Sequence, residues 1–394
     1  MISVQEAKHI IRTHAVALPP VLVPLPQAAG KVLATDVYSA IDIPAYDQSA
    51  MDGYALNYQG WQQHQTLEVQ GELPAGDAGQ YTLQNQQAMR IFTGAAVPAG
   101  ADTVVMQEKI SFINGHLRIL DDQLKPGHNV RPKGSEIKAG ELALPKGTLL
   151  TPAAIGFLAT TGVAEASVYP CPIVSIIVTG NELQQPGEPL AYGQVYECNS
   201  YSLRAILNQL GIDNIRLYKV RDEAEAVQEV LGQALLVSDI VLLTGGVSVG
   251  NYDFVPDAAA QCGVTKLFHK IKQRPGKPLY TGVKENKMVF GLPGNPSSVL
   301  TCFYEYVIPA LEQVMQQKNL MKVVQAPIGK DYNKTAPLTF FLKGHYNGQQ
   351  AVPLEAQESY RLRSFATANC LLCLPEDKME FKKGDMVEVH LLDL

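Results

Sequence analysis

The feature that most constrains the fold is an alternation of apolar strands and helical segments between Cys171 and Met315. Four mostly apolar runs predict the strands, and they are 173–178, 215–220, 240–244 and 288–292. Strands that are apolar on both faces are typical of a parallel sheet, because helices cover both of its faces. We therefore expect a doubly wound α/β domain over residues 171–324.

Helices are expected between these strands and before them. The segments are 3–15, 151–162, 199–210, the stretch from Asp222 to Val237, 253–261, and a long helix from Pro296 to about Met315. Thr151 is interpreted as an N-cap with Pro152 in the first helical position. Asp222 is also interpreted as an N-cap. A role in a ligand site is the alternative for this residue.

Short strands and turns flank the α/β region on both sides. Residues 32–148 alternate short apolar runs with Gly- and Pro-rich turns, which is typical of β structure. Residues 325–394 return to that pattern and predict a small separate β domain. The whole protein is therefore expected to be a multidomain protein with both α/β and β domains.

The composition excludes several classes of protein. The chain has 394 residues, of which 46% are hydrophobic and 18% charged, and its net charge is −6, as expected for a globular protein rather than a nucleic-acid binder. The chain shows no signal peptide and no apolar run long enough for a membrane span, so we expect a cytoplasmic protein. Its six cysteines form no disulfide framework, and Cys370 and Cys373 are interpreted as buried thiols in a strand rather than a metal or redox pair.

The run from Thr244 to Gly250 follows a predicted buried strand. Glycines allow backbone N–H groups to approach an anion closely, so this run is a candidate binding site for a phosphate or oxyanion. A tight turn without a ligand is the alternative. The run matches neither the P-loop nor the dinucleotide-binding fingerprint, which disfavours both of those chemistries.

Cations and acids occur near other predicted strand ends. Arg274 and Lys277 flank a proline-rich turn, which is either a clamp for anions or a solvated basic loop. Glu182 and Asp253 could hold Mg²⁺ beside phosphate oxygens, or they could cap helices. The loop 42–55 contains three acids, and metal binding and Asx-turns are equally good explanations for them.

Seven short motifs occur together and in order. They are 47–55 (DQSAMDGYA), 90–95 (RIFTGA), 103–108 (TVVMQE), 179–183 (TGNEL), 245–250 (GGVSVG), 275–278 (PGKP) and 292–296 (LPGNP). In this combination the chain closely resembles the MoeA family, which also includes the E domain of gephyrin. The resemblance covers nearly the full length and is most specific from residue 42 to residue 310.

This resemblance implies an elongated homodimer built from four-domain subunits. The domains would be 1–45 with 146–170 as a linker and N-terminal domain, an inserted β-rich domain 46–145, the molybdopterin-binding domain 171–324 and the C-terminal domain 325–394. Family members are molybdopterin molybdenumtransferases. They cleave adenylyl-molybdopterin in the presence of molybdate and a divalent cation, expected to be Mg²⁺, and give molybdenum cofactor and AMP. Their active site lies at the dimer interface.

The motifs carry the family's site residues onto this chain. The catalytic residues implied are Asp52, Glu182, Asp222, Asp253 and Lys277, and the metal ligands implied are Glu182, Asp222 and Asp253. The substrate-binding residues implied are Thr93, Gly245, Gly246, Ser248, Arg274, Pro293, Pro296 and Ser364. The chain departs from the family pattern at Asn181, where Asp is common, and near Thr339, where an Arg is expected.

Two alternatives keep part of the resemblance. The first is a molybdopterin adenylyltransferase built on the same α/β module, although such an enzyme would be about half this length. The second is a scaffold protein like gephyrin. Expected partners are a second copy of the chain, the molybdopterin adenylyltransferase and downstream cofactor-modifying proteins, but neither nucleic acid nor membrane.

Overall fold

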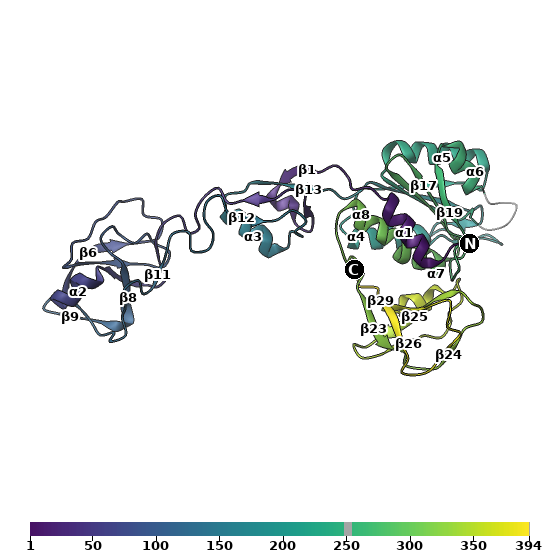
Figure 1. Cartoon of the computed structure of the whole chain (residues 1–394). Coiled ribbons are helices and arrows are strands. Elements are labelled where there is room, and N and C mark those ends of the chain that lie inside the picture. Colours follow the sequence, from purple (N-terminus) through teal and green to yellow (C-terminus); the bar gives the residue numbers. More distant parts are fainter. Residues whose placement is uncertain (248–253, 394) are drawn as a thin grey trace. The chain divides into compact units, whose positions relative to one another are not determined.

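The structure is a computed structural model that describes residues 1–247 and 254–393. The chain forms two compact units (Figure 1). The first comprises Met1–Val21, Gly30–Val32 and Ser167–Leu394, and the second comprises Leu22–Ala29 and Leu33–Ala166. None of the helices in the described part of the chain has the length and apolar character that a membrane span needs.

A six-stranded sheet forms the centre of the first unit. Its strands, in spatial order, are β17 (Ile215–Val220), β14 (Val174–Thr179), β18 (Ile240–Thr244), β22 (Lys287–Leu292), β21 (Tyr280–Lys284) and β19 (Thr265–His269). The first four strands are parallel, as predicted. Strand β21 pairs antiparallel with β22, and β19 pairs antiparallel with β21; the sequence analysis did not predict these two strands, so the sheet is mixed rather than parallel throughout. The reason is the two-residue connection after Lys284, because so short a turn can join only antiparallel strands.

Helices cover both faces of this sheet, which confirms the doubly wound architecture (Figure 1). One face carries α5 (Ala224–Val237) and α6 (Val255–Gln261). The other face carries α4 (Asn199–Gln209), α7 (Pro296–Cys302), α8 (Ile308–Val314) and α1 (Val4–His14). Each face forms its own hydrophobic core against the strands.

The long helix expected after Pro296 is interrupted. A π-helical segment, η3 (Phe303–Val307), joins α7 to α8. Pro309 explains the interruption, because it has no N–H to donate to the carbonyl of Glu305 and its ring would collide with that carbonyl in a regular α-helix. The segment places Glu305 and Tyr306 in the protein interior.

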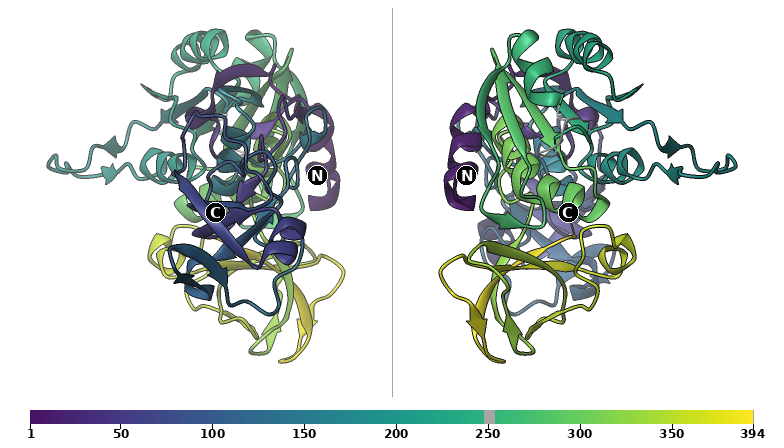
Figure 2. Two further views of the ribbon diagram at one scale, coloured as in Figure 1. Left: turned by 90° about the vertical axis from the view of Figure 1, so that its left-hand side faces the viewer. Right: turned by 90° about the vertical axis from the view of Figure 1, so that its right-hand side faces the viewer.

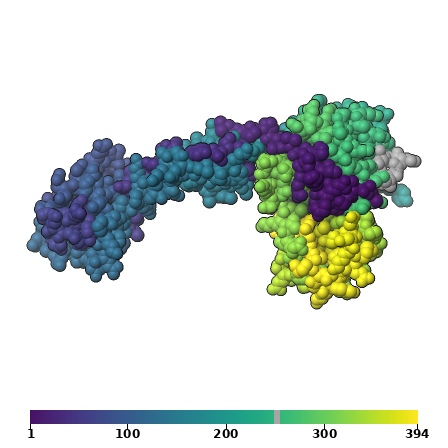
Figure 3. Space-filling view, viewed as in Figure 1, coloured from purple at the N-terminus to yellow at the C-terminus, as the bar shows by residue number. Residues whose placement is uncertain are grey.

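The N-terminal helix packs on the first unit. Ser3 caps α1 by accepting a hydrogen bond from the N–H of Glu6 at 3.2 Å, and Val4, Ala7 and Ile11 are buried against α8 and η3. Figure 3 shows this purple helix on the surface, beside the green α/β region and the yellow C-terminal region.

The C-terminal region of the first unit is a second sheet with its own core. Its strands, in spatial order, are β20 (Gln273–Arg274), β25 (Thr339–Tyr346), β27 (Cys370–Leu374), β29 (Met386–Leu391) and β23 (Val323–Pro327), with β26 (Ala351–Pro353) beside β25. The remaining elements are α9 (Leu362–Ala366), β24 (Tyr332–Asn333) and β28 (Glu380–Phe381). Strand β20 lies within the α/β part of the sequence but pairs with β25. It therefore links the C-terminal sheet to the proline-rich turn that Arg274 and Lys277 flank.

A long excursion separates β14 from α4. It contains the short strands β15 (Leu183–Gln184) and β16 (Val195–Tyr196), which pair with each other. Figure 2 shows this teal arm projecting from the rest of its unit. Tyr192 near its tip is fully exposed.

The second unit is rich in β structure, as predicted. Its main sheet has the spatial order β8 (Thr103–Met106), β5 (Gly53–Leu56), β7 (Gln87–Ile91), β6 (Thr66–Leu73), β10 (His116–Ile119) and β9 (Ile110–Ile113). Its helices are α2 (Tyr58–His64) and α3 (Pro152–Thr160), and Thr151 caps α3 as expected. The short elements along 21–169 are β1 (Val21–Pro24), η1 (Leu25–Ala28), β2 (Val32–Leu33), β3 (Val37–Tyr38), β4 (Gln48–Ser49), η2 (Gln107–Lys109), β11 (Val130–Arg131), β12 (Leu142–Leu144) and β13 (Glu165–Tyr169).

Candidate active site

Three neighbouring strands of the α/β sheet end at the same edge. Val178 in β14 lies opposite Thr244 in β18, and Thr244 lies opposite Leu292 in β22. The carboxyl ends of parallel strands are where open α/β sheets bind ligands. This register brings together the three sequence motifs that follow Thr179, Thr244 and Leu292.

Gly245 begins the turn after β18, and no other residue would fit there. Its φ is +91°, and a Cβ atom would lie 2.7 Å from Oγ1 of Thr179 and 2.9 Å from its carbonyl oxygen. The N–H of Gly245 donates to the carbonyl of Leu292 at 3.2 Å, which ties the turn to β22. Gly246 has a φ of +65° and exposes backbone rather than side chain to the space in front of the sheet.

The turn after β22 is held from two directions. Nδ2 of Asn199 in α4 donates to the carbonyl of Gly294 at 2.9 Å. Nδ2 of Asn295 donates to Oγ of Ser359 at 3.0 Å, and the N–H of Ser297 donates to the carbonyl of Ser359 at 3.1 Å. A loop of the C-terminal region therefore closes against the Pro-Gly-Asn-Pro turn.

A cleft of about 630 Å³ lies in front of these strand ends. Six of the site residues expected from sequence line it, and they are Glu182, Asp222, Gly245, Gly246, Pro293 and Pro296. Ser248 and Asp253 lie outside the described residues. The cleft is thus built from the carboxyl ends of β14, β17, β18 and β22 together with the turns that follow them.

Asp222 does not cap a helix, so that interpretation was wrong. The N-cap of α5 is Glu223, and its side chain makes no capping hydrogen bond. Oδ1 of Asp222 is buried and has no hydrogen-bond partner among the residues that the structure describes. Oγ1 of Thr244 is likewise buried without a hydrogen-bond partner among these residues. Burial of a polar oxygen costs free energy unless a ligand supplies the hydrogen bond or the metal contact, so both atoms favour a ligand in this cleft.

Glu182 also caps no helix. It lies in an exposed turn after β14, and the N–H of Val195 in the projecting arm donates to its carbonyl at 2.9 Å. Glu182 lines the same cleft as Asp222. The side chain is therefore available to a ligand.

A third acidic residue lines the cleft, and the sequence analysis did not identify it. Glu197 is 3% exposed, and its two carboxylate oxygens accept from the N–H and the hydroxyl of Ser200 at 2.8 Å and 2.6 Å. Its position three residues before a serine at a helix start was the available signal, since an acid there can satisfy free N–H groups of the first turn. Its contacts indicate a supporting role at the start of α4.

A second cavity, of about 450 Å³, adjoins the first. Both are lined by Pro278, Pro293, Asn295 and Tyr360, so the two cavities are neighbours, and together they are called the groove below. Arg274 and Lys277 line the second cavity. The groove therefore has an acidic end beside the Gly-rich turn and a basic end beside the proline-rich loop.

The two cations at the basic end differ in their contacts. Arg274 donates to Oγ1 of Thr335 at 3.0 Å, and its guanidinium lies 5.6 Å from the ring centre of Phe340. Lys277 is exposed and forms no ion pair within residues 1–247 and 254–393. Lys277 is thus the freer of the two charges.

The loop 354–361, which carries Tyr360 into the groove, rests on a buried lysine. Nζ of Lys343 donates to the carbonyls of Ala356, Glu358 and Arg361 at 2.9, 3.3 and 3.1 Å and contacts Oγ of Ser297 at 3.4 Å. Burial lowers the pKa of Lys343 to about 8, although Glu358 opposes the shift. Ser364 lines neither cavity. Its hydroxyl donates to the carbonyl of Ala356 at 2.8 Å and lies 3.1 Å from the carbonyl of Arg361, so it supports the same loop.

The two remaining candidates lie together in the second unit. The N–H and the hydroxyl of Thr93 donate to Oδ1 of Asp52 at 2.8 Å and 2.7 Å. These hydrogen bonds lower the pKa of Asp52. The pair therefore presents a fixed carboxylate at an exposed turn.

Comparison with known proteins identifies the family. Residues 2–162 match the family described as MoeA N-terminal region (domain I and II), residues 175–313 match the probable molybdopterin binding domain, and residues 325–392 match the MoeA C-terminal region (domain IV). A molybdopterin molybdenumtransferase from Haemophilus influenzae is 34% identical over 93% of this chain and 94% of its own length. The chain belongs to the MoeA family of molybdopterin molybdenumtransferases.

Other members of the MoeA family agree with this assignment over the whole chain. A molybdopterin molybdenumtransferase from Staphylococcus epidermidis is 34% identical over all of this chain and 96% of its own length. A crystal structure of a molybdopterin biosynthesis MoeA protein from Pyrococcus horikoshii is 30% identical, covers 99% of both chains and has a TM-score of 0.86. The expected combination of α/β and β domains is therefore confirmed.

Proposed function

We propose that this protein inserts molybdenum into adenylyl-molybdopterin and releases AMP, in the groove that the two cavities of the first unit make up. The observation that supports this most directly is the charge arrangement along the groove. Its acidic end holds Glu182 and Asp222, and its basic end holds Arg274 and Lys277. A pyrophosphate substrate that must meet a second anion needs both a cation site and fixed positive charge.

The Gly-rich turn would bind the phosphates of the substrate. Gly245 and Gly246 have positive φ angles, which suit glycine, and both line the cleft. Small residues there allow phosphate oxygens to approach backbone N–H groups. The hydroxyl of Thr244, buried without a partner in the described structure, is a further candidate donor.

The acidic end fits a magnesium ion. Oδ1 of Asp222 lacks a hydrogen-bond partner among the described residues, Glu182 lines the same cleft, and carboxylate and phosphate oxygens are the ligands that Mg²⁺ prefers. Asp222 and Glu182 would hold the ion, and Asp253 is proposed with them on the family motif. When bound, Mg²⁺ would offset the negative charge of the pyrophosphate.

The basic end would receive molybdate. Lys277 forms no ion pair with any residue that the structure describes, so its charge is available to an oxyanion, whereas Arg274 is oriented by Thr335 and Phe340. These cations reduce the repulsion between molybdate and the phosphates. Pro293 and Pro296 limit the freedom of the turn between the two ends.

We also propose that the active enzyme is a homodimer in which Asp52 and Thr93 of one subunit complete the groove of the other. The support is the family motif at Asp52 and its fixed, exposed carboxylate. Mixing Asp52→Asn and Glu182→Gln subunits tests this arrangement. Each variant alone should be inactive, and mixed dimers should recover part of the activity because one of their sites is intact. Absence of recovery after verified exchange of subunits would contradict the shared site.

The function itself is tested by molybdate-dependent release of AMP from adenylyl-molybdopterin. Glu182→Gln should lower the rate at least about 100-fold, because it removes a charge that the proposed Mg²⁺ requires. Glu188→Gln, on the projecting arm and outside the cleft, is the matched control and should retain activity. Undiminished release by Glu182→Gln would overturn the metal role. Failure of the unaltered protein to release AMP would overturn the function.

A molybdopterin adenylyltransferase is the rival activity within the same chemistry. The matches to the N-terminal and C-terminal MoeA regions argue against a lone α/β module. Incubation with ATP and molybdopterin distinguishes the two, since the proposed enzyme should form no adenylylated product.

A further inference from the structure

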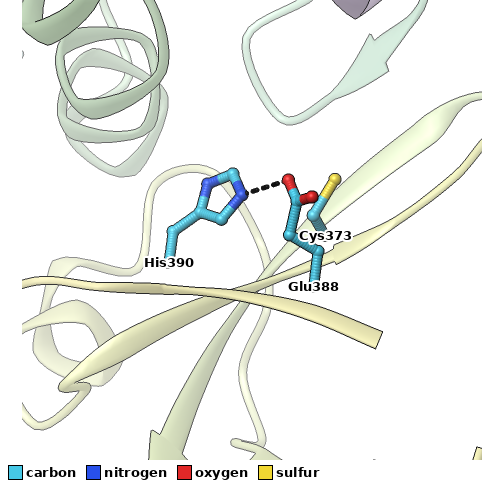
Figure 4. Close-up of side chains that lie close together, drawn as sticks. All are labelled: Cys373, Glu388 and His390. Carbon is cyan, nitrogen blue, oxygen red and sulfur yellow. Dashed lines mark hydrogen bonds and ion pairs between the residues drawn. The ribbon is translucent and has the colours of Figure 1, made fainter. Parts of the chain in front are cut away.

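Three side chains with metal-binding atoms gather on one face of the C-terminal sheet, away from the groove. Cys373 in β27 lies directly opposite Glu388 in β29, and His390 is two residues further along β29 on the same face. Sγ of Cys373, a carboxylate oxygen of Glu388 and a ring nitrogen of His390 all lie within 4.8 Å of one another (Figure 4). None of the three contributes to the proposed reaction.

The imidazole of His390 is already oriented as a metal ligand would be. Its Nδ1 lies 2.6 Å from Oε1 of the fully buried Glu305, and its Nε2 lies 2.7 Å from Oε1 of Glu388. A carboxylate on one ring nitrogen leaves the other to face the metal, an arrangement common in metalloproteins. Glu305 is fixed in turn by Nζ of Lys8 at 2.5 Å.

We propose that Cys373, Glu388 and His390 form a binding site for a transition-metal ion of the Zn²⁺ class, with a water molecule as the fourth ligand. One sulfur, one nitrogen and one oxygen ligand suit Zn²⁺, which binds such atoms at about 2.0–2.3 Å in tetrahedral geometry. The contact between Glu388 and His390 must then open by roughly 1 Å, which rotation of the half-exposed Glu388 side chain allows.

A metal ion binds the thiolate form of cysteine and an unprotonated ring nitrogen of histidine. Metal and protons would therefore compete for Sγ of Cys373 and Nε2 of His390. Binding therefore releases protons and should weaken at low pH.

A cavity of about 230 Å³ gives access to this cluster. Glu388 and His390 line it, together with Lys8, Arg12 and Glu312. It has room for the water ligand and provides a path from solvent. The site is thus open on one side, like a site that exchanges its metal or presents it to a small molecule.

Cobalt binding to the full-length protein tests the proposal. After treatment with a chelator, the unaltered chain should bind one equivalent of Co²⁺ that gives a sulfur-to-cobalt charge-transfer band, and Zn²⁺ should remove that band by displacement. Cys370→Ala is the matched control, because Cys370 is on the same strand but belongs to the core on the opposite face of the sheet. This variant should keep the band.

Cys373→Ala should lose the band and bind Zn²⁺ at least about 10-fold more weakly. Glu388→Gln provides a second variant on a half-exposed side chain, and its Zn²⁺ affinity should fall by a similar factor. Circular dichroism and thermal unfolding establish that each variant is folded. Absence of the band in the unaltered protein, or its persistence in folded Cys373→Ala, would overturn the proposed site.

Discussion

The hydroxyl of Tyr306 donates a hydrogen bond to Oε1 of Gln273 inside the first unit. The Nε2 of the same Gln273 donates to the carbonyls of Pro275 and Gly276 at 3.0 Å and 3.1 Å. The π-helical segment thereby fixes the backbone of the loop that presents Lys277. A buried side chain that contacts no substrate thus determines where a cation of the groove lies.

We expect Tyr306→Phe to leave the buried oxygen of Gln273 without its donor and to destabilise the protein by about 1–3 kcal/mol. It should also raise the KM for molybdate more than it lowers kcat, because the basic loop loses its support. Urea unfolding and molybdate-dependent AMP release measure the two effects. Tyr304→Phe is the control, since the ring of Tyr304 packs on Phe365 rather than on Gln273. Equal KM values for the two variants would contradict the positioning role.

Asp222→Asn should make the protein more stable and less active. Oδ1 of Asp222 is buried without a partner in the described structure, and a neutral amide there avoids an uncompensated charge, so we expect a gain of up to about 1 kcal/mol. The magnesium dependence of AMP release should weaken at the same time. Stability and activity often change in opposite directions when a residue of a strained functional site is replaced. A variant that loses stability and keeps full activity would show that Asp222 is structural.

Lys277→Gln should raise the KM for molybdate about 10-fold, equivalent to about 1.4 kcal/mol, because it removes a cation of the groove that forms no ion pair with the described residues. The matched control is Lys272→Gln, whose amine lies 3.9 Å from Glu376 outside the groove. Steady-state kinetics at two salt concentrations measure both variants. An identical effect of the two substitutions would mean that the overall charge, rather than the position of Lys277, is responsible.

Gly245→Ala should destabilise the protein by about 2 kcal/mol or more, because its φ is positive and the new Cβ would lie 2.7 Å from Thr179. Gly294→Ala is the comparison within the same cleft. A Cβ there meets its nearest atom, the Cα of Gly245, at 3.9 Å, so the fold should tolerate it. Thermal unfolding of both variants is the measurement. Similar melting temperatures would refute this account of Gly245.

Stability should depend on pH through Glu305 and His390 in the metal-free protein. Burial opposes both charges, but the contacts with His390 and Lys8 lower the pKa of Glu305 from 4.5 to about 2, and the contacts with Glu305 and Glu388 raise the pKa of His390 from 6.5 to about 9. The contribution of Glu305 is complete above pH 4.5 and is lost as the pH falls toward 2. That of His390 is complete below pH 6.5 and is lost as the pH rises through about 9.

Urea unfolding with a chelator present should therefore show the greatest contribution of this pair between pH 4.5 and 6.5. Glu305→Gln removes the charge that causes the shift of His390, so the decline above pH 6.5 should become shallower in this variant. An unchanged slope on the alkaline side would exclude His390 as its cause.

Local sequence patterns predicted the parts of the groove that lie directly after buried strands. Thr244 and Leu292 end apolar runs that are typical of strands in a buried parallel sheet. The turns after parallel strands lie at the same edge of the sheet, so these two turns were expected to lie together. The prediction failed where a partner lies far away in the chain. Nothing local indicates that Gln273 pairs with Thr339, or that Tyr360 lines the groove.

Residue preferences alone also misplaced some local features. Asp222 has the residue type of an N-cap, yet α5 begins one residue later than such a cap would require. The sequence from Pro296 to Met315 has helical character throughout, and only the missing N–H of Pro309 explains its π-helical segment. In both cases the overall pattern of residue types predicted a regular helix, and a single residue position determines where the regular helix begins or is interrupted.

The position of Glu305 has a consequence for the two elements that contact it. Its buried carboxylate is neutralised by Lys8 in helix α1 and by His390 in strand β29. Loss of either element leaves this charge half compensated in the interior. Helix α1 and strand β29 should therefore stabilise the first unit only together, although they lie far apart in the sequence.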